Sequence, residues 1–379
     1  MDPYAEVFAL LEDAVSQGVF PGCVAIVSRG DAVVYHGAHG TLGTHAAFVA
    51  AGEPVRLDTV YDLASLTKVL ATTTLVAIGV AEGRVDLADA VPTPWARACP
   101  GATLGDLLEH CAGLVAHREY FTEVEPFDAA AVLEKVCGTP RAGPPRERAV
   151  YSDLGFMILG AWLEQIFGAP LELAFADRVA YPLGCGDGPL PRLGFRPPRS
   201  DALVQRVLER RIAPTEVYDL GLHGDDVPSY VAVRSRVMLA HGAVHDDNAW
   251  VMGGIAGHAG LFGDAMAVHA AATAWLDTTL PGLTPALRDR FWRPSTVPGS
   301  TRRVGFDGVA PDGSGAMADV ATPAAVGHTG FTGTSLWIDP AARGGARIFV
   351  LLTNRVHPVR SDDRIKALRQ RFHRAAMAL

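Results

Sequence analysis

The chain has 379 residues, of which 49% are hydrophobic, and its 41 acidic side chains outnumber 33 basic ones. This composition is typical of a globular protein with a large core, and the net charge of −8 argues against the broad basic surface that nucleic acid requires. Lysine occurs only at Lys68, Lys135 and Lys366, so arginine carries most of the positive charge.

Targeting signals and the pattern of cysteines indicate the cellular compartment in which the protein is expected. The segment from Met1 to Pro21 has no basic region followed by an apolar stretch, so no secretory signal is visible. Five scattered cysteines without a CxxC pair favour a reducing compartment. No uninterrupted apolar run is long enough to span a membrane. We therefore expect a cytoplasmic protein without a membrane span, and the sequence leaves its oligomeric state open.

The two ends of the chain predict a shared antiparallel sheet. An amphipathic N-terminal helix is followed by apolar runs at Cys23–Ser28 and Ala32–His36, a pattern typical of a β-hairpin. Near the other end, Thr334–Ile338 and Arg347–Leu352 form a second strand pair, and Asp362–Leu379 closes the chain as a helix. Both units, each a hairpin with a helix, can belong to one sheet with flanking terminal helices.

The middle of the chain predicts helices. The helical period fits better than alternation in five segments, Leu66–Ala81, Leu104–His110, Ala129–Val136, Leu154–Phe167 and Leu171–Val179. We therefore predict an α/β (α+β) fold, one unit of two lobes. A discontinuous α/β lobe with a central antiparallel sheet comprises about residues 1–64 plus 265–379, and a mostly helical lobe of about residues 65–264 is inserted into it.

The tetrapeptide Ser65-Leu66-Thr67-Lys68 opens the first of these helices. Residues three apart lie on one helical face, so the Ser65 hydroxyl and the Lys68 amine can meet. The backbone N–H of Ser65 would lie at the positive end of the helix dipole, where an oxyanion is stabilised. The apolar neighbours of Lys68 predict a lowered pKa, and burial together with a cationic or hydrogen-bonding neighbour can make its amine neutral near pH 7. The alternative is an N-cap serine followed by a solvated lysine.

Tyr151-Ser152-Asp153 immediately precedes the helix predicted from Leu154. A tyrosine at a junction between a loop and a helix can point its phenol into a cleft, and a phenolate beside an ammonium is a competent general base. The alternatives are a half-buried aromatic for Tyr151 and an N-cap for Asp153.

Two glycine-rich stretches occur in the second half. In Gly327-His328-Thr329-Gly330-Phe331-Thr332-Gly333, closely spaced glycines let the backbone approach a ligand, and one N–H can be a second oxyanion donor. His328 and Thr329 can then bond a substrate carbonyl or carboxylate, although alone this is a glycine-rich turn. The other stretch, residues 253–262, matches no phosphate loop. We expect it to be a packed turn in which His258 is structural.

With Ser65-x-x-Lys68, Tyr151-x-Asp153 and His328-Thr329-Gly330 in this order, the chain resembles the serine β-lactamase and penicillin-binding-protein superfamily. It is most similar to the class C-like, β-lactamase-related serine hydrolases. The resemblance implies a β-lactamase/transpeptidase-like fold with the site between its two lobes. Asp153 stands where that branch has Asn, and His328 stands where it has Lys.

The resemblance also implies roles for individual residues. Ser65 would be the acylated nucleophile, Lys68 and Tyr151 the proton-transfer pair, and the backbone N–H groups of Ser65 and Phe331 the oxyanion hole. The substrate would be bound by Asp153, His328, Thr329 and Gly330. The changes at Asp153 and His328 add a negative charge and remove a fixed ammonium, which disfavours the carboxylate of a β-lactam or of a peptide C-terminus.

The implied function is that of a serine hydrolase that forms an acyl-enzyme and needs no cofactor or metal. Its substrate would be an ester or amide, such as a small ester or a D-amino-acid peptide, with weak or no β-lactamase activity. One alternative is a catalytically silent protein on the same fold that binds cell-wall peptides or a partner. A lesser alternative is a metal-dependent hydrolase, because His241-x-x-x-His245 with Asp246, Asp247 and His258 offers ligands, although no HExxH motif is present.

Overall fold

The first and last strands of the chain lie side by side in a six-stranded sheet with the order β2-β1-β9-β8-β7-β6. All neighbouring strands in this sheet are antiparallel. The strands are β1 (Gly22–Arg29), β2 (Ala32–Gly40), β6 (Asp307–Gly308), β7 (Val326–Thr329), β8 (Ser335–Asp339) and β9 (Arg347–Thr353). The structure is a computed structural model that describes residues 2–46, 51–188, 190–195, 210–218, 227–234, 241–317 and 320–379.

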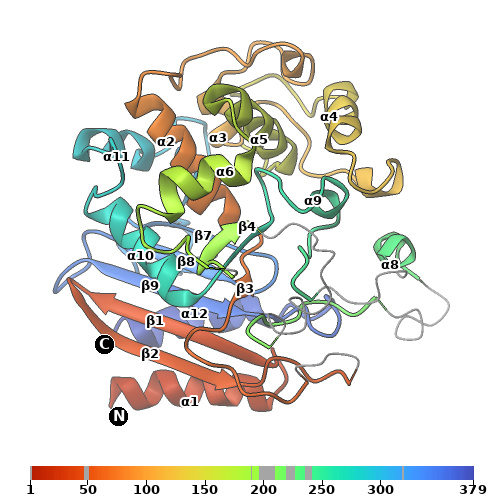
Figure 1. The fold of residues 1–379 in the computed structure, drawn as a ribbon. Helices are drawn as coiled ribbons and strands as arrows, with labels where there is room; N and C mark the ends of the chain where they lie inside the picture. Colours follow the sequence, from red (N-terminus) through yellow and green to blue (C-terminus); the bar gives the residue numbers. More distant parts are fainter. Residues whose placement is uncertain are drawn as a thin grey trace.

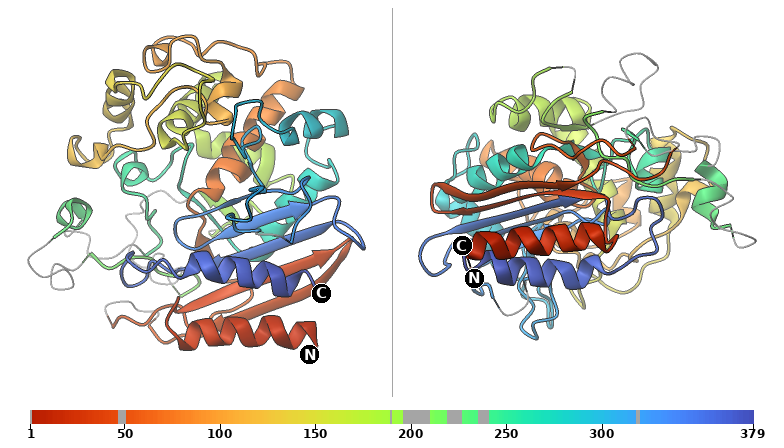
Figure 2. Two further views of the ribbon diagram at one scale, coloured as in Figure 1. Left: turned by 180° about the vertical axis from the view of Figure 1, so that it is seen from behind. Right: turned by 90° about the horizontal axis from the view of Figure 1, so that it is seen from below.

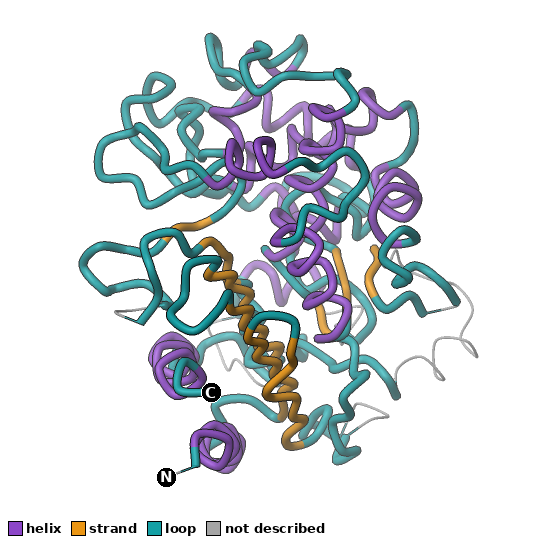
Figure 3. The backbone as a smooth tube through the Cα atoms, turned by 90° about the vertical axis from the view of Figure 1, so that its left-hand side faces the viewer, coloured by secondary structure: helices purple, strands orange, loops and turns teal. Residues whose placement is uncertain are grey.

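Helices cover both faces of this sheet. The terminal helices α1 (Pro3–Ser16) and α12 (Ile365–Ala376) run side by side across one face (Figure 2), and α10 (Ala265–Leu276) packs on the other. Viewed along the sheet, the terminal helices lie on one side and the helices from the middle of the chain on the other (Figure 3). The predicted arrangement of a sheet between terminal helices and a helical region is confirmed.

The apolar pattern of β1 follows from this layering. Val24 and Ile26 point into the large core shared with α10 and the helical region, whereas Cys23, Ala25 and Val27 point into the core under the terminal helices. Because both faces are buried, the strand is apolar at nearly every position instead of alternating.

The helical region carries the remaining elements (Figure 1). Its α-helices are α2 (Thr74–Ala81), α3 (Leu104–Leu108), α4 (Ala129–Gly138), α5 (Asp153–Phe167), α6 (Leu171–Phe175), α8 (Ser229–Arg234), α9 (Asp247–Val251) and α11 (Pro285–Trp292). Short turns of 3-10 helix occur at Trp95–Arg97 and Tyr120–Thr122, and π-helical turns occur at Lys68–Thr73 and Ala176–Ala180. A small sheet of order β3-β5-β4 joins Tyr61–Asp62, Leu261–Gly263 and Leu193–Phe195.

The helix predicted over Leu66–Ala81 begins with a π-helical turn, Lys68–Thr73, before it continues as α2. The hydroxyl of Thr74 donates to the carbonyl of Val69, five residues earlier, at 3.0 Å. The hydroxyl of Thr72 donates to the carbonyl of Gly257 at 2.6 Å. Threonine hydroxyls thus bond carbonyls at the start of this helix, and one of them ties it to the second glycine-rich stretch.

Other predicted elements need two corrections. Val326–Thr329 is strand β7, so His328 and Thr329 lie in a strand and the turn begins only at Gly330. A Cβ at Gly327 would lie 2.3 Å from the carbonyl oxygen of Leu336, so this glycine permits close packing of strands and does not form a turn. The small sheet was not predicted because its strands are only two or three residues long. The division into two lobes at the stated boundaries stays a prediction.

Among the described residues, no single helix is long and apolar enough to cross a bilayer. One pair of consecutive helical segments, Asp153–Phe167 and Leu171–Ala180, reaches that length and composition, but it is bent by 72°.

Gly257 is required where the second glycine-rich stretch packs against α5. A Cβ at Gly257 would lie 2.1 Å from the carbonyl oxygen of Phe156 and 2.8 Å from the amide nitrogen of Gly160. Because both contacts are with backbone, we expect Gly257→Ala to destabilise the protein by about 2–3 kcal/mol, measured by thermal unfolding. In Gly138→Ala, where a Cβ meets nothing within 4 Å, stability should be unchanged or slightly higher. Equal melting temperatures for the two variants would contradict the argument.

Candidate active site

Ser65 follows a backbone position that is rarely adopted by L-residues. Ala64 has φ +48°, and its N–H donates to the Asp62 carboxylate at 2.8 Å. The Thr67 hydroxyl donates to the Ala64 carbonyl at 2.6 Å. This left-handed residue costs about 1–2 kcal/mol, so the surrounding hydrogen bonds must hold it. The turn brings Ser65 to the wall of a cavity of about 680 Å³.

Lys68 is completely buried, and its ammonium reaches three acceptors. The Nζ atom lies 3.0 Å from Ser65 Oγ, 3.2 Å from the carbonyl oxygen of His258 and 2.8 Å from Asp153 Oδ1. An ammonium has three protons, so each is directed to one acceptor. The predicted contact between Ser65 and Lys68 is therefore present, and the solvated-lysine alternative is wrong.

The predicted lowering of the Lys68 pKa is wrong. Burial lowers the pKa of Lys68, as expected, but Asp153 and Tyr151 outweigh it and hold the pKa above its ordinary value. Burial also raises the pKa of Asp153, yet Lys68 and His117 dominate and keep it well below its usual range. The two groups form an ion pair, so Lys68 is an ammonium near pH 7 and not the neutral amine that its apolar neighbours suggested.

Asp153 is the first residue of α5 and not its N-cap, which is Ser152. The Ser152 hydroxyl donates to the carbonyl of Val115 at 2.7 Å instead of capping the helix. The Asp153 carboxylate bridges two side chains, because its second oxygen lies 3.4 Å from His117 Nδ1. This hydrogen bond raises the pKa of His117. Asp153 lines the cavity, and its role toward a substrate stays a prediction.

Tyr151 lies at the cavity wall between two cations, as the loop-to-helix position predicted. Its ring centroid is 5.0 Å from Lys68 Nζ and 4.9 Å from the guanidinium carbon of Arg302. The rings of His110 and His328 lie 4.6 and 5.7 Å away, centroid to centroid. Burial lowers the pKa of both histidines, with Arg302 and Lys68 contributing, so the neighbouring positive charge comes from Lys68 and Arg302.

His328 is neutral and does not replace the missing ammonium. Its Nδ1 lies 2.8 Å from the carbonyl oxygen of Thr329, which can only accept, so Nδ1 carries the proton. Burial, Lys68 and Arg302 together lower its pKa to about 3. Its Nε2 is a buried acceptor without a hydrogen-bond partner among the residues described. His328 and Thr329 both line the cavity, as the predicted binding role requires.

Gly330 lets the β7–β8 turn approach the segment before Ser65. A Cβ at Gly330 would lie 2.7 Å from the carbonyl oxygen of Leu63. The hydroxyl of Thr334 donates to that same carbonyl at 2.9 Å, and the hydroxyl of Thr332 donates to the carbonyl of Asp62 at 2.8 Å. The turn therefore places Phe331 at the same cavity as Ser65.

The two predicted oxyanion donors are available for a ligand. Neither the N–H of Ser65 nor that of Phe331 has a hydrogen-bond acceptor within the described ranges. Both residues line the cavity. Two unused backbone donors at one cavity are what a developing oxyanion needs.

The three histidines considered as metal ligands, His241, His245 and His258, each contact a different partner. His241 Nε2 lies 2.8 Å from the carbonyl oxygen of Ile212, and His245 Nε2 lies 2.8 Å from Glu216. His258 Nε2 lies 2.9 Å from Asp246. Residues 241–246 form no helix, so the expected helical spacing of two ligands is wrong. In the part of the chain described, no three His, Cys, Asp or Glu side chains gather into a metal-binding group.

Several residues of the site were not found from the sequence. Arg302 and His117 line the cavity, His110 packs on Tyr151, and Asp62 holds the turn before Ser65. Arginine is so frequent here that Arg302 carried no signal, and nothing local marks the other three. Only the tertiary fold brings them together.

Ser65, Lys68 and Tyr151 thus meet at one cavity, and the comparisons with known proteins identify the family. The β-lactamase family profile matches residues 7–373, so this chain belongs to the β-lactamase family. It is a serine hydrolase of that family. A protein of Salmonella gallinarum with the provisional name D-alanyl-D-alanine carboxypeptidase is 30% identical over 368 residues, covering 89% of this chain and 79% of the relative.

Solved structures share the fold. Simvastatin synthase (LovD) from Aspergillus terreus superposes with a TM-score of 0.70 at 19% identity, covering 100% of this chain and 98% of that one. EstCE1, described as a hydrolase with promiscuous acyltransferase activity, gives 0.70 at 20% identity and covers 98% of each chain. SurE with D-Leu gives 0.68 at 23% identity, covering 98% of this chain and 75% of that one. The predicted β-lactamase/transpeptidase-like fold is confirmed.

The charge of Lys68 should depend on Asp153. In Asp153→Asn, burial still lowers the pKa of Lys68 but its main opposing cause is gone, so the pKa should fall. A lysine is charged below its pKa, so the variant should lose the Lys68 proton at a lower pH than the wild type. Because the chain has three lysines, ¹³C-lysine NMR titration can follow each one.

The matched control for this titration is Glu123→Gln. Glu123 lies 2.8 Å from Lys135, with both side chains well exposed, so this change should affect Lys135 and leave Lys68 unchanged. An unchanged or higher pKa of Lys68 in Asp153→Asn would show that Asp153 does not hold its charge.

Proposed function

We propose that the protein hydrolyses an ester or amide through an acyl-enzyme on Ser65. The observation that carries this proposal is the 3.0 Å contact between Ser65 Oγ and the buried Lys68 ammonium at the cavity wall. A serine hydroxyl is a weak nucleophile at its free pKa, and a fixed positive charge beside it stabilises the alkoxide that attacks a carbonyl. The membership in the β-lactamase family supports the same assignment.

Tyr151 is the proposed general base. Lys68 already directs its three protons to Ser65, His258 and Asp153, so it stabilises charge and does not accept the serine proton. Tyr151 lines the same cavity as Ser65, with its ring centroid 5.0 Å from Lys68 Nζ and 4.9 Å from the guanidinium carbon of Arg302. The proton of Ser65 passes to Tyr151 as Oγ bonds the carbonyl carbon, and Tyr151 returns it to the leaving group.

The oxyanion formed in this step is bound by two backbone groups. The N–H groups of Ser65 and Phe331 are unused and line the cavity, which supports their role as the oxyanion hole. Collapse of the tetrahedral intermediate leaves the acyl group on Ser65 Oγ. Water then attacks the acyl carbon as Tyr151 accepts its proton, the acyl–Oγ bond breaks, and Tyr151 returns the proton to Ser65 Oγ as the acid is released.

The proposed substrates are small esters and D-amino-acid peptides. Relatives named as D-alanyl-D-alanine carboxypeptidases support the peptide, and the fold shared with an esterase-like hydrolase is compatible with the ester. The neutral His328 and the anionic Asp153 weaken binding of a β-lactam carboxylate. For the location we propose the cytoplasm, supported by five cysteines that are all unpaired.

Removing the nucleophile should abolish activity. Ser65→Ala should eliminate covalent labelling by a fluorophosphonate and all turnover, and Lys68→Ala and Tyr151→Phe should each be nearly as severe. Because the three groups act as one unit, the double variant Lys68→Ala/Tyr151→Phe should lose little more than either single variant. Active-site labelling and ester hydrolysis measure this outcome.

The matched control is Ser361→Ala, since Ser361 is an exposed serine at the same cavity. This variant should label like the wild type. Full activity of Ser65→Ala would refute the mechanism, and absence of labelling in the wild type would favour the catalytically silent binding protein.

The substrate class can be tested with three compounds side by side. We expect a short-chain nitrophenyl ester to be hydrolysed most readily and a D-Ala-D-Ala peptide next. A chromogenic cephalosporin should have a kcat/KM at least about 100-fold below that of the ester, because the site lacks a fixed ammonium at His328 for its carboxylate, and the same lack should keep the peptide below the ester. A cephalosporin turned over as fast as the ester would contradict this order.

A further inference from the structure

His245 contacts both segments that supply the proposed oxyanion donors. It is 3% exposed and lies just before α9. Its ring stacks on the ring of Phe331, with centroids 5.6 Å apart and planes inclined by 22°. Phe331 is 51% exposed, and Arg355 also holds it, with its guanidinium carbon 4.4 Å from the ring centroid and its Nε donating to the Phe331 carbonyl at 2.8 Å.

The backbone of His245 reaches the other segment. Its N–H donates to Asp62 Oδ2 at 2.6 Å, while Asp62 Oδ1 accepts the N–H of Ala64 at 2.8 Å. Asp62 is 2% exposed, so this carboxylate forms a buried bridge between the two backbones. Since Ala64 immediately precedes Ser65, His245 is linked both to the turn before Ser65 and to Phe331.

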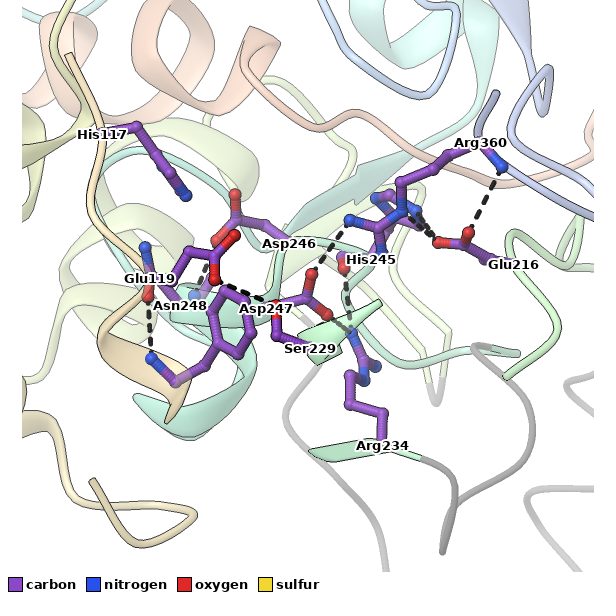
Figure 4. Close-up of polar contacts among 12 residues, drawn as sticks. His117, Glu119, Glu216, Ser229, Arg234, His245, Asp246, Asp247, Asn248 and Arg360 are labelled. Atoms are coloured by element: carbon purple, nitrogen blue, oxygen red, sulfur yellow. Dashed lines mark hydrogen bonds and ion pairs between the residues drawn. The ribbon is translucent and has the colours of Figure 1, made fainter. Parts of the chain in front are cut away.

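A buried ionic network binds the His245 ring at its Nε2 atom (Figure 4). His245 Nε2 lies 2.8 Å from Glu216 Oε2, and Glu216 is fully buried. Arg360 bonds Glu216 through Nε at 2.5 Å and Asp247 through Nη1 at 3.0 Å, and Asp247 also pairs with Arg234 at 3.1 Å. The ring is therefore fixed in its orientation toward Phe331.

We infer that His245 is a positioning residue that keeps the backbone N–H groups of Ser65 and Phe331 in the relative positions needed to bind the oxyanion. This inference rests on the proposed function. The ring of His245 fixes Phe331, and the backbone N–H of His245 fixes the turn before Ser65 through Asp62. His245 acts through these groups, and none of its atoms is needed in the reaction itself.

The expected effect is moderate, because other contacts also hold the turn. Thr332 and Thr334 bond the backbone of Asp62 and Leu63, so the base of the turn stays in place without the His245 ring. Loss of an entire oxyanion donor costs about 10²–10³ in kcat, and a shifted donor should cost less. We therefore expect about a 10-fold loss in kcat when the stacking contact is removed.

Two substitutions separate the two functions of the ring. His245→Phe keeps an aromatic stack on Phe331 and loses the bond to Glu216. His245→Gln keeps a donor for Glu216 and loses the stack. The backbone N–H to Asp62 remains in both variants. His241→Gln is the matched control, because His241 is also buried in the same segment and bonds the carbonyl of Ile212.

The readouts are kcat, KM, the affinity for a boronic acid and the melting temperature. His245→Gln should lose about 10-fold in kcat and a similar factor in boronic-acid affinity, with KM within about 2-fold, because the oxyanion forms only after substrate binds. His245→Phe should melt at a lower temperature than His245→Gln yet keep kcat within about 3-fold. His241→Gln should leave kcat unchanged.

Three results would overturn the inference. One is full kcat in His245→Gln, and another is a loss of kcat that follows the loss of melting temperature across all three variants. The third is a rise in KM with kcat unchanged, which would assign the ring to substrate binding. Failure of the proposed function is distinguishable, since it shows as undiminished labelling in Ser65→Ala while His245 is intact.

Discussion

The buried ammonium of Lys68 is the charge around which the site is built. Its three acceptors come from the turn at Ser65, the first residue of α5 and the carbonyl of His258. A buried charge that lost its partner would cost about 3–5 kcal/mol. Folding must therefore bring three separate segments to one point before this ammonium is tolerated. The stability of the helical region and the geometry of the nucleophile thus depend on the same contacts.

Burial and the presence or absence of a partner carboxylate together determine which groups near Tyr151 are charged. His110 and His328 are both buried beside the two cations, and the pKa of each is lowered for that reason. Lys68 is equally buried but stays charged, because Asp153 compensates it. The difference is a carboxylate within 2.8 Å, and it leaves the phenol facing permanent cations and neutral rings.

Local patterns in the sequence predicted what depends on local structure. The spacing of Ser65 and Lys68 on one helical face, the hairpin at each end of the chain and the position of Tyr151 before a helix follow from short-range geometry. The charge of Lys68 did not follow, because Asp153 is distant in sequence and its approach is a tertiary contact. Arg302 was missed for the same reason, and His245 was interpreted only as a candidate metal ligand. Gly327 was misinterpreted because a glycine that permits strand packing looks the same in sequence as one that forms a turn.

The two departures from the β-lactamase pattern are best understood as one change in the charge of the site. The resemblance places Asn at position 153, and an amide there would leave burial as the main influence on Lys68, which favours a neutral amine. Asp153 instead fixes Lys68 as an ammonium and removes it as an acceptor of protons. At position 328 a neutral histidine replaces a lysine, and Arg302 supplies a cation on the Tyr151 ring. The site thus retains positive charge beside the phenol, while His328 presents no ammonium to a substrate carboxylate.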